Sequence, residues 1–149
     1  MFEPPFTRPA WLSLLSRASV QALTGLLAAA PPLPGFTRLR GPEIGMSMVR
    51  ARAGGGGGAF NLGETTLARC SIRDAAGRVG HGYAMGRDGA QVELIARLDA
   101  VLQDGAFYPA FEAAVLCPLA EAEQARRTEI AAKAAATGVQ FFTLAAMRG

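Results

Sequence analysis

A glycine-rich stretch decides the fold of this chain: residues 52–88 read RAGGGGGAFNLGETTLARCSIRDAAGRVGHGYAMGRD. Two alternating runs, residues 66–73 and 79–85, flank an Ala-Ala-Gly-Arg turn. Alternation with a period of two on both sides of a turn that contains glycine is typical of a β-hairpin. Asp88, with Gln91 three residues later, matches the pattern of a helix cap. The stretch therefore predicts a strand, a turn, a strand and a capped helix.

Two short helices are expected before this stretch. Thr7 can cap the first, which has Pro9 in its first turn, and Ser19 can cap the second. Three prolines between residues 31 and 34 end the second helix.

Two helices are expected after the hairpin. Residues 89–103 form the clearest one, because leucines recur on one face and Glu93 can pair with Arg97. A long alanine-rich helix is expected over residues 119–137, while residues 107–116 fit a helix and a strand equally well.

The strands set the expected fold class. Residues 36–40 and 46–53 look extended, with a Gly-Pro turn between them. With the hairpin they make about four strands joined by short turns, which favours mainly antiparallel pairing. We therefore expect an α+β fold: a mainly antiparallel sheet, N-terminal helices, one central amphipathic helix, and a long C-terminal helix with an extended tail. A single domain should span residues 1–149, with residues 1–8 as a loose arm.

Composition limits the possible classes of protein. Half of the 149 residues are hydrophobic and 18% are charged, which indicates some apolar surface that a partner covers. The chain has no apolar run of about 18 residues and no secretory signal pattern. Two cysteines fit a reduced, cytoplasmic setting. The net charge is +3, yet basic residues are not interleaved with aromatic ones, so neither nucleic acid nor a membrane is an expected partner.

Five consecutive glycines, of which Gly54 is the first and Gly58 the last, are a candidate phosphate site. Bare backbone amides can surround an anion. However, no Gly-Lys-Ser/Thr follows, and the loop leads into a predicted strand instead of a helix. A flexible hairpin connection is the favoured interpretation. The alternative is a stand-alone nucleotide- or phosphate-binding protein that uses this loop with Arg69 or Arg87.

Few side chains suit catalysis. His81 is the single histidine, and with Cys70 and Cys117 far apart in the sequence it cannot build a typical zinc site. The two cysteines cannot hold an iron–sulfur cluster unaided. We therefore assign no catalytic residue and no metal ligand. The candidate contacts for an anion or a partner are Glu64, Arg69, His81 and Arg87.

Several short motifs, taken together and in order, resemble one known family. They are GETTLAR at residues 63–69, GRD at 86–88, LA at 119–120, and VQFFT at 139–143 with MRG at 147–149. Their order and spacing, from about Trp11 to the last residue, resemble the PhnG family. Its members are subunits of the bacterial carbon–phosphorus lyase, which breaks down alkylphosphonates. The pure glycine run is longer than the family pattern leads us to expect.

The resemblance implies a subunit that is not active alone. Members of the family work in a hetero-octameric core with PhnH, PhnI and PhnJ, two copies of each, and PhnI is the closest partner. With the associated ATP-binding PhnL, the complex transfers an alkylphosphonate to the ribose anomeric carbon of ATP and releases adenine. The product is α-D-ribose 1-methylphosphonate 5-triphosphate. The resemblance places an iron–sulfur cluster and S-adenosylmethionine in PhnJ, and no cofactor in this chain.

The resemblance also suggests where a partner would bind. The hairpin, the C-terminal helix and the tail are apolar, alanine-rich and arginine-bearing, and they are hypothesised to contact PhnI. The tail is too apolar to extend freely into water, so its large residues are candidate interface contacts: Phe141, Phe142, Met147 and Arg148. Deletion of residues 139–149 is expected to abolish copurification with PhnI.

Overall fold

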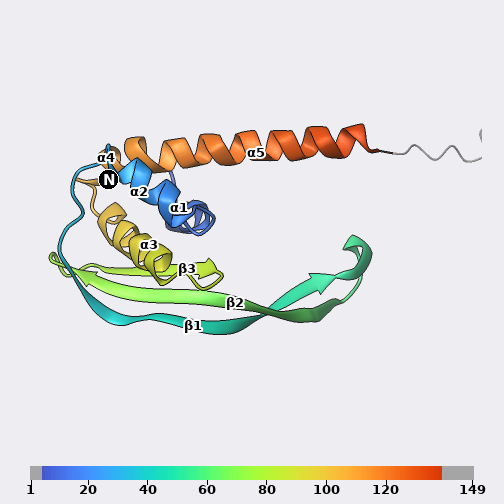
Figure 1. Ribbon diagram of the computed structural model, residues 1–149, viewed down its shortest axis with the longest axis horizontal. Helices are drawn as coiled ribbons and strands as arrows, with labels where there is room; N and C mark the ends of the chain where they lie inside the picture. The colour runs from blue at the N-terminus through green and yellow to red at the C-terminus, as the bar shows by residue number, and fades with distance from the viewer. Residues whose placement is uncertain (1–4, 139–149) are drawn as a thin grey trace, which may run out of the picture.

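A computed structural model describes residues 5–138 of the chain, and within them the fold is α+β (Figure 1). The strands are β1 (Phe36–Arg52), β2 (Ala59–Asp74) and β3 (Val79–Met85), paired antiparallel in the order β1-β2-β3. The α-helices are α1 (Arg8–Leu15), α2 (Val20–Leu27), α3 (Gly89–Leu102), α4 (Tyr108–Phe111) and α5 (Cys117–Ala136). A short 3-10 turn, Ala53–Gly55, follows β1, and a π-helical turn, Glu112–Leu116, joins α4 to α5.

The described residues form three strands instead of about four, because the first two expected strands are one continuous strand, β1. The Gly-Pro step forms no turn. Instead, the pairing with β2 shifts register on both sides of Arg40, and Gly41 takes a φ of +71°. Such bulges let one strand accommodate an extra residue without ending. Because β1 is an edge strand, a proline that lacks an N–H group is tolerated there.

The hairpin and the capped helix are confirmed. β2 and β3 pair with each other across a turn in which the N–H of Gly77 donates to Asp74 O. The carboxylate of Asp88 accepts from the backbone N–H of Gln91 at 3.0 Å and caps α3. The side chain of Gln91 does not return to the cap. It donates to Ala18 O at 2.7 Å and so ties α3 to the segment between α1 and α2.

Helix α3 lies directly on the sheet because β3 carries glycines where the two meet. A Cβ atom on Gly80 would lie 1.9 Å from Ala96 O, and one on Gly82 would lie 1.9 Å from Val92 O. Both distances are far below van der Waals contact, so only glycine permits this approach. The alternate residues of β2 on this face, such as Cys70 and Ile72, are buried beneath α3.

A second layer of helices covers the other side of α3. The hydrophobic core includes Leu15 of α1, Leu23 of α2, and Tyr108 and Phe111 of α4, all of them fully buried. Figure 1 shows α1, α2 and α5 above α3, with the sheet below it. The N-terminal segment is part of this packing: Phe6 packs against the core, and Arg8 already belongs to α1. The expected loose arm at residues 1–8 therefore does not describe Phe6 or Arg8.

One expectation about the helices needs correction, and one question that the sequence left open is answered. Glu93 does not pair with Arg97; it accepts from Arg38 Nε at 2.6 Å, while the guanidinium of Arg97 lies 4.6 Å from the centre of the Phe36 ring. The segment at residues 107–116, which fitted a helix and a strand equally, is helical and leads directly into α5. Pro118 stands in the first turn of α5, directly after the π-helical turn.

Candidate functional site: an exposed arm and an uncovered helix

Strands β1 and β2 form an arm that extends past the rest of the sheet. β3 pairs with β2 only from Arg73 to Leu67, so the remainder of β2 pairs with β1 alone. Figure 1 shows this arm reaching beyond α3, with the glycine-rich connection at its tip. The hairpin interpretation of the glycine run is thereby confirmed, since Arg52 pairs with Ala59 across it.

One face of the arm carries exposed apolar side chains on β1, opposite Thr66 and Glu64 of β2. Ile44 pairs with Ala68, which lies beneath α3, and paired residues of antiparallel strands share a face. Because side chains alternate along a strand, the α3 side of the arm is continued on β1 by Met46 and Met48. Leu62, an exposed residue of β2, lies nearby, where the pairing shifts register between Val49 and Arg50. Their exposed fractions are 55% for Ile44, 71% for Met46, 49% for Met48 and 64% for Leu62. We call these four residues the arm stripe.

Helix α5 is the second uncovered element. None of its residues is buried in the described part of the chain, and its first turns alone pack near the body, through Leu119. The rest projects away from α1 and α2 in the same direction as the arm in Figure 1. An alanine-rich helix with few large apolar residues buries little apolar surface within its own chain. Contact with a partner would therefore stabilise α5 further. Among the described residues, no helix combines the length and apolar character that crossing a bilayer requires.

The predicted contact residues lie at separate places. Glu64 is exposed on the arm, opposite Met48, and Arg87 is exposed in the connection from β3 to α3. Arg69 is half-buried on the face of the sheet that α3 leaves free, where its Nη2 atom lies 2.9 Å from the carboxylate of Glu43. Arg40 binds the same carboxylate at 3.0 Å and lowers the pKa of Glu43, with Arg69 adding to the effect. Arg69 is thus engaged within the chain.

His81 lies in strand β3, next to Ser71 of β2. Its Nδ1 atom lies 2.9 Å from Ser71 Oγ, and its backbone N–H donates to Asp99 at 2.9 Å. Asp99 therefore meets the backbone of His81 on the α3 side, not its ring, so serine, histidine and aspartate form no triad. Within residues 5–138, no three histidine, cysteine, aspartate or glutamate side chains come together as a metal site.

The geometry also separates the glycine loop from Arg69, one of the two arginines of the nucleotide-binding alternative. The glycine loop ends where β2 begins, at Ala59, and Arg69 lies ten residues further along the same strand. A strand rises about 3.3 Å per residue, so the loop and Arg69 stand roughly 33 Å apart. They cannot bind the same phosphate group. The candidate tail contacts Phe141, Phe142, Met147 and Arg148 lie outside the described residues.

Three arginines surround Glu123, in a cluster that the sequence patterns did not predict. The Glu123 carboxylate accepts from Arg126 Nε at 2.8 Å, from Arg127 Nε at 2.9 Å and from Arg17 Nη1 at 3.0 Å. Hydrogen bonds from Arg126 and Arg127 lower the pKa of Glu123 to about 2. The spacing of Glu123, Arg126 and Arg127 on a helix could have indicated their pairing. Nothing local in the sequence indicates Arg17, which the fold brings in from the end of α1.

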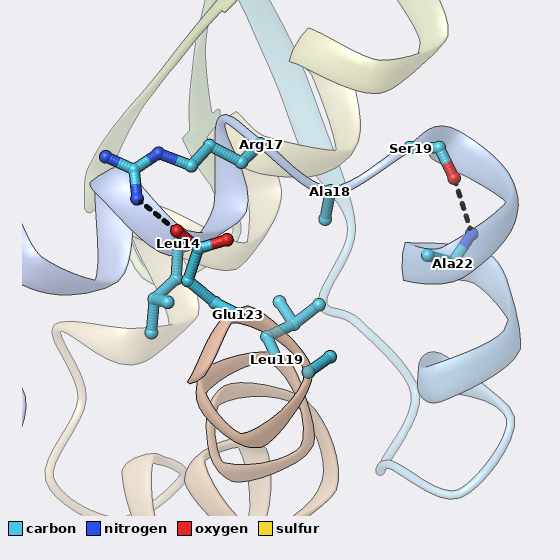
Figure 2. A pocket seen from close by; sticks show the side chains of 8 residues that line it. Leu14, Arg17, Ala18, Ser19, Ala22, Leu119 and Glu123 are labelled. Atoms are coloured by element: carbon cyan, nitrogen blue, oxygen red, sulfur yellow. Dashed lines mark hydrogen bonds and ion pairs between the residues drawn. The ribbon is translucent and has the colours of Figure 1, made fainter. Parts of the chain in front are cut away.

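A hollow of about 340 Å³ lies beside this cluster, between α1, α2 and the start of α5 (Figure 2). Its lining is mostly apolar, with Leu14, Ala18 and Leu119 around it and the Arg17–Glu123 ion pair at its edge. The side chain of Ser19 accepts from the N–H of Ala22 at 3.2 Å and caps α2 at the opposite edge. The hollow therefore combines an apolar lining with a basic edge.

Fold and surface together define a class of protein: a small α+β domain whose β1–β2 arm and helix α5 are left uncovered by the rest of the chain. Comparison with known proteins identifies the family. The model of the family "Phosphonate metabolism protein PhnG" matches residues 6–149, so the chain belongs to the PhnG family. It is also 40% identical, over 135 residues, to the alpha-D-ribose 1-methylphosphonate 5-triphosphate synthase subunit PhnG of Rhizobium meliloti (strain 1021), covering 89% of this chain and 85% of that protein.

Proposed function

We propose that this chain is a structural subunit of an alpha-D-ribose 1-methylphosphonate 5-triphosphate synthase, the carbon–phosphorus lyase core complex. In this role it supports the transfer of an alkylphosphonate to the ribose anomeric carbon of ATP without supplying the reacting groups. Family membership and the name of the Rhizobium meliloti relative support the proposal. PhnI is its closest partner, with PhnH, PhnJ and the associated PhnL in the same assembly.

The observation that carries the proposal is the arm stripe. Met46 and Leu62 are 71% and 64% exposed on a two-stranded arm, where water is an unfavourable neighbour. A two-stranded hairpin is only marginally stable by itself, so a bare apolar arm suits a chain whose arm is completed by another subunit. Contiguous exposed apolar residues of this kind mark protein interfaces.

The described side chains also support the proposal that other subunits bind the substrates and cofactors. Buried Cys70 and half-buried Cys117 lie on β2 and α5, and His81 is engaged with Ser71. We therefore propose that ATP and the phosphonate are bound mainly by other subunits, and that the iron–sulfur cluster and S-adenosylmethionine belong to PhnJ.

The test is assembly of the complex from coexpressed subunits. The double variant Met46→Glu with Leu62→Glu should leave the chain folded but abolish its copurification with PhnI. Ser47→Glu, on the same strand and the opposite face, should copurify as the natural chain does. Normal assembly of the double variant would refute the role of the arm stripe.

The remaining alternative, a stand-alone nucleotide-binding protein, is separated by calorimetry. Micromolar binding of ATP to the purified chain favours this alternative, whereas no binding favours the subunit. Turnover of a phosphonate with ATP by the isolated, monomeric chain would overturn the proposed function altogether.

A further inference from the structure

We propose that the hollow between α1, α2 and α5 is a docking site for an acidic, amphipathic segment of another subunit. An apolar side chain of that segment fills the hollow, and its neighbouring carboxylates bind the arginines of the Glu123 cluster. The inference rests on the proposed function as a subunit, and it names a second surface, distinct from the arm stripe, with the chemistry of its occupant.

The charge of the cluster calls for an acidic occupant. Arg17, Arg126 and Arg127 all bind the single carboxylate of Glu123, and Asp88 lines the neighbouring hollow with Arg17 and Arg126, so the three arginines still outnumber the carboxylates around them. The pKa of Glu123 is lowered to about 2, hence it stays ionised at neutral pH and the excess does not vary there. A carboxylate from a partner would balance this excess of positive charge.

Arg17 and Arg127 have further N–H donors that do not bind Glu123. Arg17 binds Glu123 through Nη1 alone, and Arg127 through Nε alone. Their side chains are 50% and 59% exposed. The remaining N–H groups of each planar guanidinium are therefore accessible in the described structure, in the fork geometry that binds a carboxylate through both oxygens.

The hollow itself calls for an apolar group. Leu14, Ala18, Ala22, Leu119 and Ala122 line it, and Figure 2 shows Leu119 and Ala18 beside the Arg17–Glu123 pair. Its volume of about 340 Å³ is ample for one large apolar side chain. A buried apolar anchor surrounded by polar contacts is the arrangement that supplies most of the binding energy in protein interfaces.

Two neighbouring hollows favour a peptide segment over a small anion. One, of about 650 Å³, is lined by Arg126 and by Met85, which is 70% exposed; the other, of about 300 Å³, is lined by Phe6 and Arg127. Arg17 borders all three hollows. Apolar side chains and arginines thus lie near one another over the three hollows, which matches a chain segment that carries both apolar and acidic residues. A free inorganic phosphate would leave the apolar lining bare, and ATP is therefore included as a competing ligand in the test.

The test uses full-length chain and the assembled complex. Ala22→Phe fills the hollow from an exposed helix position, with Gln21→Phe as the neighbouring control outside it. The double variant Arg17→Glu with Arg127→Glu reverses the charge, with Lys133→Glu further along α5 as its control. Circular dichroism establishes that each variant is folded. The Kd for association with the remaining subunits is then measured at low and high salt.

We expect Ala22→Phe and the double charge reversal each to raise the Kd at least about tenfold, with the salt dependence lost in the charge variant. Both controls should match the natural chain. A photo-crosslinking residue at position 22 should join a segment of another subunit that carries apolar and acidic residues. Unchanged Kd values, or crosslinks confined to copies of this chain, would overturn the inference while leaving the arm-stripe proposal intact. Tight binding of inorganic phosphate or ATP at the cluster would also overturn the inference, because the ligand of the cluster would then be a small anion and not a peptide segment.

Discussion

The indole Nε1 of Trp11 donates to a carboxylate oxygen of Asp99 at 3.0 Å, and this contact joins helix α1 to helix α3. The same carboxylate, fully buried, accepts from Arg8 Nη2 at 2.6 Å and from the backbone N–H of His81 at 2.9 Å. One acid therefore holds together the N-terminal helix, the central helix and strand β3. Because all its oxygens have donors, the buried charge is compensated.

Replacement of Asp99 should destabilise the fold strongly. In Asp99→Asn, the amide NH₂ group would face the N–H donors of Arg8, Trp11 and His81, which could then no longer all be bound. Arg8 would also lose its counter-charge. We expect the free energy of unfolding to fall by about 3–5 kcal/mol, as for other broken buried pairs. Urea denaturation measures the change. Asp88→Asn, where asparagine is an equally good helix cap, should change it by less than about 0.5 kcal/mol.

The glycines of β3 give a second stability prediction. Gly82→Ala would place a Cβ atom 1.9 Å from Val92 O, so α3 must move off the sheet. We expect a loss of at least about 3 kcal/mol, at the upper end of overpacking effects. Gly63→Ala is the matched control, since a Cβ there meets nothing within 4 Å. Equal melting temperatures for the two variants would contradict the close packing of α3 on β3.

The turn between β2 and β3 predicts a loss of stability in acid. Burial raises the pKa of Asp74, but hydrogen bonds from the side chain and backbone of Arg78 outweigh it, so the pKa lies below its ordinary value. The pKa of Asp104 is also lowered, first by the backbone N–H of Ala106 and then by Arg78. A lowered pKa in the folded state stabilises the fold above the unfolded value of about 3.9, and this contribution disappears as the pH falls.

The free energy of unfolding should therefore decline as the pH falls below about 5, toward the folded pKa values of the two aspartates. In Arg78→Met the decline should be shallower, because the unfolded and folded pKa values are then closer together. Denaturation series between pH 3 and 7 test the slope. Arg73→Met, an exposed position of β2, should keep the slope of the natural chain.

Local patterns predicted those parts of the fold that local forces determine. The alternation in residues 66–73 and 79–85, and the cap at Asp88, specify β2, β3 and the start of α3 through neighbours in the sequence. The Gly-Pro step misled the prediction, since a turn and a bulge need the same residues. Pairing with the far side of the hairpin decided between them, because β2 continues opposite β1 through Gly41 and beyond.

The candidate site was less predictable, because tertiary packing assembles it. Arg69 was chosen as an anion contact, yet the fold gives it Glu43 as a partner from a different strand. Arg17 and Glu123 are 106 positions apart, and only the packing of α1 against α5 brings them together. The exposure of Met46 and Leu62 is likewise a property of where α3 ends, which no periodicity in β1 or β2 reveals.

The arm stripe leads to a final prediction about the isolated chain. Two-stranded arms with bare apolar faces and open edges associate with one another when their partner is missing. We expect sedimentation of the purified chain to show concentration-dependent self-association, and the double variant Met46→Ser with Leu62→Ser to be monomeric under the same conditions. Since both positions are exposed, the free energy of unfolding of the monomer should change by no more than about 0.5 kcal/mol per substitution. A purified natural chain that stays monomeric at high concentration would contradict this prediction, because the exposed arm stripe would then need no protein partner.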